Sequence, residues 1–138
     1  MAAESAVFTM AYTRAGLVPD GSSTFFMPRK IGDRRTRELM LTNRVLKAEE
    51  AQEWGIVNEV TANDEMLGRA RSIARELASG PTLAYGAVKT LLNGTFEQTL
   101  ESQMELEARA IAELSVSADG DEGIRAFVEK RKPEFKGE

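Results

Sequence analysis

The 138-residue sequence contains no cysteine and no histidine. Without cysteine the chain has no disulfide, no thiol nucleophile and no thiolate metal ligand. Without histidine it lacks the Ser-His-Asp and Cys-His catalytic arrangements, the usual zinc clusters and the commonest general base. Any acid or base chemistry must therefore come from Asp, Glu, Tyr or Lys side chains.

Long apolar runs and an excess of positive charge are missing as well. No window approaches the roughly 18 apolar residues that a membrane span needs, and the first residues lack the basic and apolar regions of a signal peptide. The 22 acidic and 18 basic residues leave a net charge of -4, which argues against nucleic-acid binding. We therefore expect a cytoplasmic protein with no membrane and no nucleic-acid partner.

Apolar residues recur at helical spacing over most of the chain after Ser22. Stop signals such as Gly55, and Gly80 followed by Pro81, separate the periodic segments. The pattern predicts helices over residues 33–42, 48–54, 64–79 and 83–93, a longer helix capped by Thr95 and Gln98, and a last helix over 121–131.

Signals for β-structure are few. Residues 6–12, AVFTMAY, alternate in the manner of a short strand, and a second strand is expected at Ile56 to Val60. Two strands so far apart do not make a stable sheet by themselves, so their partners are either missing from this chain or supplied by another. We expect a mostly α-helical chain with one or two short strands.

The segment AGLVPDGSST, residues 15–24, places Asp20 between Pro19 and Gly21. Pro presets φ, Asp accepts backbone hydrogen bonds and Gly takes positive φ, so the triplet predicts a turn. Ser22 and Ser23 predict the N-cap of a following helix. A carboxylate in a loop beside apolar residues also suits an acid with a tuned pKa, so both interpretations stay open at this point.

Basic side chains concentrate between residues 29 and 47. Phosphate recognition is one interpretation, but Asp33 and Glu38 interrupt the cluster, which favours a solvated helix face. The cluster holds seven of the 18 basic residues: Arg29, Lys30, Arg34, Arg35, Arg37, Arg44 and Lys47.

The order of the motifs resembles the C-terminal half of the crotonase superfamily, the enoyl-CoA hydratases and isomerases. The segments that carry the resemblance are GLVPD, LMLTNR, AEEAQEWGIVNEV, GPTLAYGAVK and DGDEGIRAFVEKRKPEF, and the match runs from about Ala2 to Phe135. The resemblance implies an α/β crotonase-like spiral, truncated here to its last part over residues 1–60 with the Asp20 loop. Residues 61–138 would form the helical oligomerisation region that packs trimers, often paired into hexamers.

The resemblance also implies an activity and its partners. The expected function is that of an acyl-CoA isomerase in which Asp20 moves a proton beside the thioester through an enolate. The coenzyme A thioester is the substrate, and neither a metal nor a redox cofactor is needed. In the family the preceding half supplies the oxyanion hole, so we expect the isolated chain to be inactive. Two alternatives stay open: a truncated fragment that only oligomerises, and an enoyl-CoA hydratase.

Two positions separate the subfamilies. Hydratases carry a catalytic Glu seven residues before the loop proline, where this chain has Tyr12. Asp20 matches the acid of dienoyl-CoA isomerases, of 4-chlorobenzoyl-CoA dehalogenase and of the ring-epoxide isomerases of phenylacetyl-CoA breakdown, and GLVPDGSST is most similar to the last group. We therefore expect Asp20 to be catalytic, with Tyr12, Leu17 and Pro19 contacting the substrate.

Two departures from the family pattern concern the backbone. Many members have two glycines where Ser22 and Ser23 stand, so we expect a slightly different local conformation. Lys47 replaces the usual Ser or Thr cap before AEEA, which affects stability more than chemistry.

Overall fold

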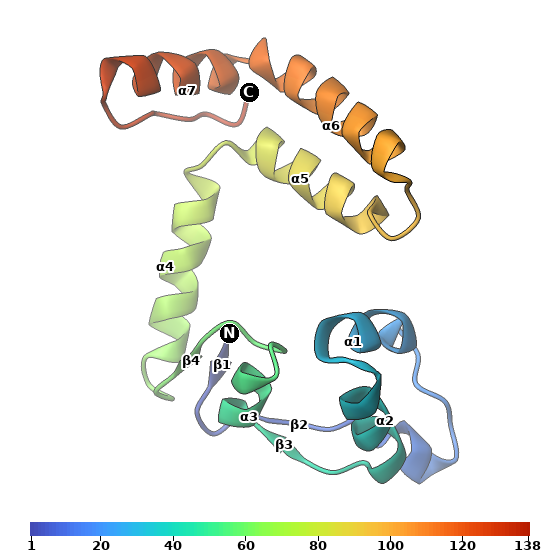
Figure 1. The fold of residues 1–138 in the computed structure, drawn as a ribbon. Coiled ribbons are helices and arrows are strands. Elements are labelled where there is room, and N and C mark those ends of the chain that lie inside the picture. Colours follow the sequence, from blue (N-terminus) through green and yellow to red (C-terminus); the bar gives the residue numbers. More distant parts are fainter. The chain divides into compact units, whose positions relative to one another are not determined.

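The computed structural model describes the whole chain from Met1 to Glu138. Internal contacts divide it into two compact units, Met1–Ala70 and Arg71–Glu138, a later boundary than the one after residue 60 expected from the sequence. Figure 1 shows that the first unit contains the strands together with α1 to α3, whereas the second consists of helices and a C-terminal tail. No helix has the combination of length and apolar character that a membrane span requires.

Four strands of two residues each lie in the first unit. Ala2–Ala3 (β1) pairs in parallel with Val60–Thr61 (β4), and Val7–Phe8 (β2) pairs antiparallel with Leu46–Lys47 (β3). Each sheet has only two strands, an arrangement that is marginal by itself in water. β1 and β3 were not predicted, because two residues are too few to display an alternating pattern.

The strand predicted over residues 6–12 is wrong beyond Phe8. Residues Ala11–Ala15 form a 3-10 helix (η1) instead, which ends at Gly16 with a left-handed φ of +69°. Contacts of η1 with α2 account for the difference, because tertiary packing overrides a weak alternating pattern. The strand predicted at Ile56 to Val60 is displaced to β4, and Ile56 packs against the core.

The α-helices lie close to the predicted ranges. They are α1 (Ser23–Ile31), α2 (Asp33–Thr42), α3 (Ala48–Glu53), α4 (Met66–Ala78), α5 (Thr82–Gly94), α6 (Leu100–Ser115) and α7 (Ala118–Glu129). The predicted cap of α6 is wrong: Thr95 ends α5, and Thr99 caps α6 by accepting the Ser102 N–H at 3.2 Å. Likewise α7 begins before residue 121, because Ser117 caps it through the Gly120 N–H at 3.0 Å.

A small apolar core holds the first unit together. Leu46, Ala48 and Ala51 are fully buried at its centre, where β3 leads into α3. Trp54 packs at the edge of this core, and the guanidinium groups of Arg35 and Arg44 lie 4.7 and 4.8 Å from its ring. The other buried members of the core are Ala2, Ile31, Leu39 and Val57.

The second unit buries much less. α5 contacts α6, and α6 contacts α7, yet α4, α5 and α6 contain no buried residue, and only Asp119 and Ala126 of α7 are buried. An apolar groove of about 500 Å³ lies along α5 and α6 and includes Val88, Leu91 and Ile111. We call this surface the α5–α6 groove. Most of the apolar stripe predicted for these helices is therefore on the surface of the chain.

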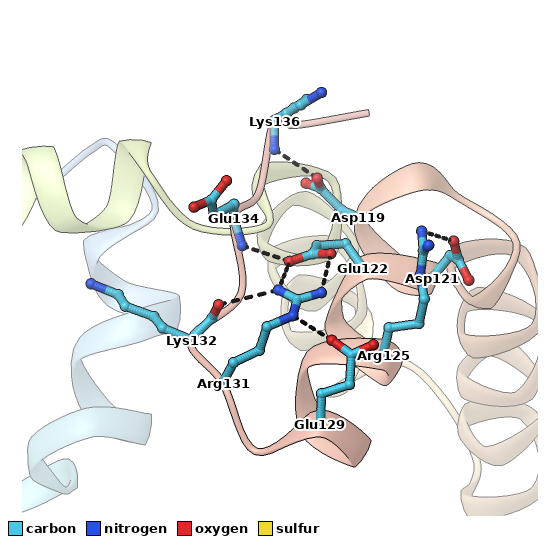
Figure 2. A network of polar contacts seen from close by, with 9 residues as sticks. All are labelled: Asp119, Asp121, Glu122, Arg125, Glu129, Arg131, Lys132, Glu134 and Lys136. Atoms are coloured by element: carbon cyan, nitrogen blue, oxygen red, sulfur yellow. Dashed lines mark hydrogen bonds and ion pairs between the residues drawn. The ribbon is translucent and has the colours of Figure 1, made fainter.

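The C-terminal tail folds back along α7, as Figures 1 and 2 show. The buried Asp119 carboxylate accepts the backbone N–H groups of Lys136 at 2.7 Å and Gly137 at 2.8 Å. The Asp119 N–H in turn donates to the Glu138 carbonyl at 2.9 Å. One side chain of the first turn of α7 thus holds the last residues of the chain.

A second carboxylate fastens the start of the same tail (Figure 2). The Glu122 carboxylate accepts hydrogen bonds from the two terminal nitrogens of Arg131 at 2.6 and 2.9 Å and from the Glu134 N–H at 2.9 Å. These hydrogen bonds, with the one from Arg131 first, lower the pKa of Glu122 from 4.5 to about 2. The tail is therefore joined to α7 by charge-assisted bonds, and the Phe135 ring of the tail also lies against Gly123 of α7.

Candidate active site

Asp20 lies on an exposed loop between η1 and α1. The loop leaves η1 at Gly16, and the Leu17 N–H donates to the Tyr12 carbonyl at 3.1 Å. Gly21 has a φ of +61°, so the turn that Pro19, Asp20 and Gly21 predict is confirmed. The chain therefore turns sharply at the one acidic residue of the loop.

The entry into α1 differs from the predicted serine cap. Ser22 is the N-cap residue, but its side chain makes no capping hydrogen bond, and its φ of +61° is left-handed. Ser23 instead bonds backwards, donating its hydroxyl at 2.8 Å and its N–H at 3.1 Å to the Asp20 carbonyl. The backbone at Asp20 is held in this way while its side chain is left exposed.

The Asp20 carboxylate is paired with Tyr12. The phenol donates a hydrogen bond to Oδ1 at 2.8 Å across eight residues of sequence, and Oδ2 makes no hydrogen bond within the chain. This hydrogen bond and the negative charge of Asp20 raise the pKa of Tyr12 above its ordinary value of 10.0. At neutral pH the phenol is thus a protonated donor that fixes one oxygen of the carboxylate.

A buried polar group anchors η1, which carries Tyr12. The Asn43 side chain is buried; its Oδ1 accepts the Arg14 N–H at 3.3 Å and its Nδ2 donates to Thr13 Oγ1 at 2.5 Å. The Thr13 hydroxyl donates to the Met40 carbonyl at 2.8 Å, and the Arg14 guanidinium donates to the Asn43 carbonyl at 2.9 Å. These bonds fix η1, and with it Tyr12, to the C-terminal end of α2.

An apolar depression adjoins the loop. It measures about 420 Å³, and both Leu17 and Pro19, predicted to contact substrate, line it together with Val18 and Met40. Leu17 and Val18 are 63% and 76% exposed, so this surface is open to a bound apolar group. Tyr12, the third residue predicted to contact substrate, is not part of this lining and lies against Asp20 instead.

Two of the seven residues of the basic cluster, Arg37 and Arg44, are paired with carboxylates. Arg44 pairs with Glu38 and bonds both oxygens of Glu50 at 2.6 and 2.9 Å, and Arg37 bonds Asp33 at 2.7 Å. The hydrogen bonds raise the pKa of Arg44 and lower that of Glu50. These pairs favour the interpretation as a solvated helix face over a phosphate site.

An acid on a tight turn, paired with a phenol, on a loop that adjoins an apolar depression, is a candidate proton-transfer site in a chain without histidine or cysteine. The family described as "Enoyl-CoA hydratase/isomerase" matches the chain over residues 1–138. The chain belongs to this family, whose members are enzymes, and both the predicted resemblance and the crotonase-type fold are confirmed.

Three relatives illustrate the range of the family. The 1,2-epoxyphenylacetyl-CoA isomerase of Escherichia coli (strain K12) is 39% identical over 137 residues, which are 99% of this chain and 52% of the relative. The 4-chlorobenzoyl coenzyme A dehalogenase-1 of Arthrobacter sp is 42% identical over 78% of this chain and 39% of the relative. The crystal structure of an enoyl-CoA hydratase/isomerase from Cupriavidus metallidurans CH34 is 36% identical with a TM-score of 0.90, covering 98% of this chain and 51% of that chain.

The chain spans about half the length of these relatives or less. Relatives named as an isomerase, as a probable hydratase and as a dehalogenase all match it, so the comparisons show the family as a whole. Among the residues, sequence reasoning missed Asn43. Its signal was an Asn directly after a predicted helix, where the left-handed conformation that ends a helix is common.

Proposed function

We propose that the chain provides the acid/base part of an acyl-CoA isomerase, with Asp20 as the group that carries the proton. The observation that supports this most is the exposed Asp20 carboxylate, held at Oδ1 by Tyr12 with Oδ2 left unbonded. Its place directly after Leu17, Val18 and Pro19, which line the apolar depression, suits a thioester with an apolar acyl or ring group.

The proposed reaction is a proton relocation in two steps. Asp20 removes a proton from the carbon beside the thioester carbonyl, which becomes an enolate, and then returns the proton to a different carbon of the conjugated system. The carboxylate is regenerated and no electron is gained or lost, so the chemistry requires neither a metal nor a redox cofactor. The enolate oxygen needs hydrogen-bond donors, and losing one such donor typically costs about 100-fold or more in rate.

Tyr12 favours isomerisation over hydration. The residue stands where the family resemblance places a catalytic Glu of the hydratases, and it provides a neutral phenol rather than a second carboxylate. Adding water across a double bond calls for a group that activates the water as well as one that protonates carbon. Because Asp20 is the only carboxylate of this loop, one group that moves a single proton between two carbons is enough for isomerisation but not for hydration.

We propose further that the isolated chain is inactive. By resemblance, the donors of the oxyanion hole and most contacts with coenzyme A belong to the preceding half of the family fold, and this chain spans about half of its relatives. Asp20 would then work only when a polypeptide corresponding to that half completes the site.

The test is an assay of the chain, alone and in a longer version that carries the upstream half, with a 3-enoyl-CoA and with a 2-enoyl-CoA. We expect the longer version to form the conjugated 2-enoyl thioester and the Asp20→Asn variant to lose this activity. If the isolated chain turns over substrate, and Asp20→Asn abolishes this turnover, the proposed inactivity of the isolated chain is wrong. Efficient hydration of the 2-enoyl thioester without isomerisation would disprove the proposed reaction.

A second candidate function is that of an oligomerising module without catalysis. The α5–α6 groove favours it, because a surface lined by Val88, Leu91 and Ile111 is seldom left exposed in a stable protein. We propose that copies of the chain associate through the helical unit as trimers or hexamers, in line with the family resemblance. Light scattering that finds a stable monomer at all accessible concentrations would exclude this assembly.

A further inference from the structure

We propose that Tyr12 is the positioning residue of Asp20: its phenol holds Oδ1 so that Oδ2 faces the proton that is transferred. The inference rests on the proposed function of Asp20 and goes beyond it, since it assigns Tyr12 to the carboxylate and not to the substrate. The geometry behind it is the 2.8 Å hydrogen bond between the Tyr12 hydroxyl and Asp20 Oδ1.

Asp20 needs such a partner because its surroundings do little to orient its side chain. The residue is exposed, and the two bonds from Ser23 reach its carbonyl oxygen rather than its carboxylate. A free carboxylate on a loop samples several rotamers, whereas proton transfer requires a fixed approach to the reacting carbon. The phenol provides the one hydrogen bond within the chain that selects a rotamer of Asp20.

Tyr12 is itself fixed from the interior of the unit. It lies on η1, whose neighbouring residues Thr13 and Arg14 are bonded to the buried Asn43 at the end of α2. The buried Asn43 side chain therefore fixes η1, η1 fixes the position of the Tyr12 phenol, and the phenol orients the Asp20 carboxylate. Only the last of these contacts lies at the surface, where a substrate has access.

The chemistry of a phenol suits this role. Near Asp20 the pKa of Tyr12 is raised, so the hydroxyl stays protonated and neutral across the physiological range. A carboxylic acid at position 12 would bring a second negative charge beside Asp20, and two such groups compete for one proton. Tyr12 instead orients Asp20 without taking part in the proton exchange.

The pairing can be tested on the 138-residue chain without any assay of catalysis. The chain has two tyrosines, so the Tyr85→Phe variant leaves Tyr12 as the only phenol, and its ionisation is followed by ultraviolet absorbance with circular dichroism to monitor folding. We expect Asp20→Asn to shift this titration to lower pH. Glu49→Gln, which removes an exposed charge elsewhere in the same unit, leaves it in place. An identical titration with Asp20 and with Asn at position 20 overturns the inference.

Hydrogen exchange at neutral pH gives a second measurement that does not depend on folding in alkali. The Ser23 amide donates to the Asp20 carbonyl, and the Thr36 amide donates to the Gly32 carbonyl elsewhere in the unit. We expect Tyr12→Phe to accelerate exchange at Ser23 and not at Thr36. Unchanged exchange at Ser23 in this variant contradicts a positioning role.

In the catalytically active form, Tyr12→Phe is expected to lower kcat about tenfold and to change KM by less than about twofold. The double variant with Asp20→Asn is expected to be no slower than Asp20→Asn alone, because both changes act on one carboxylate. Full activity of Asp20→Asn would refute the proposed function. Loss of activity in Asp20→Asn together with unimpaired Tyr12→Phe would refute only the inference about Tyr12.

Discussion

Ser22 holds the backbone in a conformation that suits glycine. Its φ of +61° follows Gly21, also at +61°, and its hydroxyl makes no capping bond. A left-handed conformation costs a non-glycine residue about 1–2 kcal/mol. Replacing the residue by glycine removes this cost, but part of the gain is lost because glycine gives the unfolded chain more conformational freedom. A glycine, which the family resemblance places here, adopts this conformation without that cost.

We predict that Ser22→Gly stabilises the first unit by about 0.5–1 kcal/mol. Urea unfolding followed by the fluorescence of Trp54, the only tryptophan, measures this. Ser22→Ala is the matched control, since it removes the same hydroxyl and keeps the Cβ atom that causes the strain. Equal midpoints for the two variants would show that φ at this position does not limit stability.

Asn43 combines a left-handed backbone with a buried, fully bonded amide. Its φ is +53°, and its side chain bonds to the Arg14 N–H and the Thr13 hydroxyl. We predict that Asn43→Ala destabilises the first unit by about 2–3 kcal/mol, because buried partners lose their bonds and Ala tolerates this φ poorly. Asn43→Gly keeps the backbone relaxed, so it should cost about 1–2 kcal/mol in the same urea experiment. If both variants lose the same free energy of unfolding, the backbone conformation at position 43 contributes nothing and the amide accounts for the whole effect.

The α-helices were predictable from the sequence because their cause is local. Apolar spacing predicted α2 over its observed range, whereas the start of α6 was missed because Thr95 and Thr99 both offer a capping hydroxyl. The strands follow from pairing between distant residues, such as Val7 with Lys47, which no local pattern reveals.

The candidate site divides in the same way. Pro19, Asp20 and Gly21 specify a turn by their own conformational preferences, so its presence was predictable. The bond between Tyr12 and Asp20 requires η1, and an alternating pattern over residues 6–12 predicted a strand there. Tyr12 was expected from the family resemblance to contact the substrate, and the structure shows its phenol bonded to the Asp20 carboxylate.

At the level of one helix, the pKa of Glu122 predicts a dependence on pH. Because its pKa falls from 4.5 to about 2 in the folded chain, Glu122 stabilises the tail fully above pH 4.5, and this contribution is lost as the pH falls toward 2. We expect the nuclear magnetic resonance signal of the Glu134 amide, which donates to Glu122, to move to its unfolded position over this range.

Two variants check that Glu122 is responsible. In Glu122→Gln the ion pair with Arg131 is lost, so the start of the tail is released at neutral pH while Asp119 still holds its end, and the Glu134 amide shows no acid transition of this kind. Glu113→Gln removes an exposed carboxylate of α6 and should keep the wild-type transition. An acid transition that persists in Glu122→Gln would assign it to another group, such as Asp119.

For the whole molecule, the contrast between the two units matters most. The first unit buries seven apolar residues in one core, whereas the second buries only Asp119 and Ala126. Since burial of apolar surface is the main favourable term in folding, the second unit is expected to be the less stable when nothing covers it. A covering surface that binds only the folded form would raise its stability by mass action.

We predict that urea unfolds the second unit first, so that the helical circular dichroism is lost at a lower concentration than the Trp54 fluorescence signal of the first unit. If copies of the chain cover the α5–α6 groove, the circular dichroism transition moves to higher urea as protein concentration rises. Ile111→Glu, in the groove and 72% exposed, should abolish this dependence. Ala112→Glu adds the same charge to α6 outside the groove and should preserve it. Transitions that coincide at every concentration would show that the second unit is stable without a covering surface.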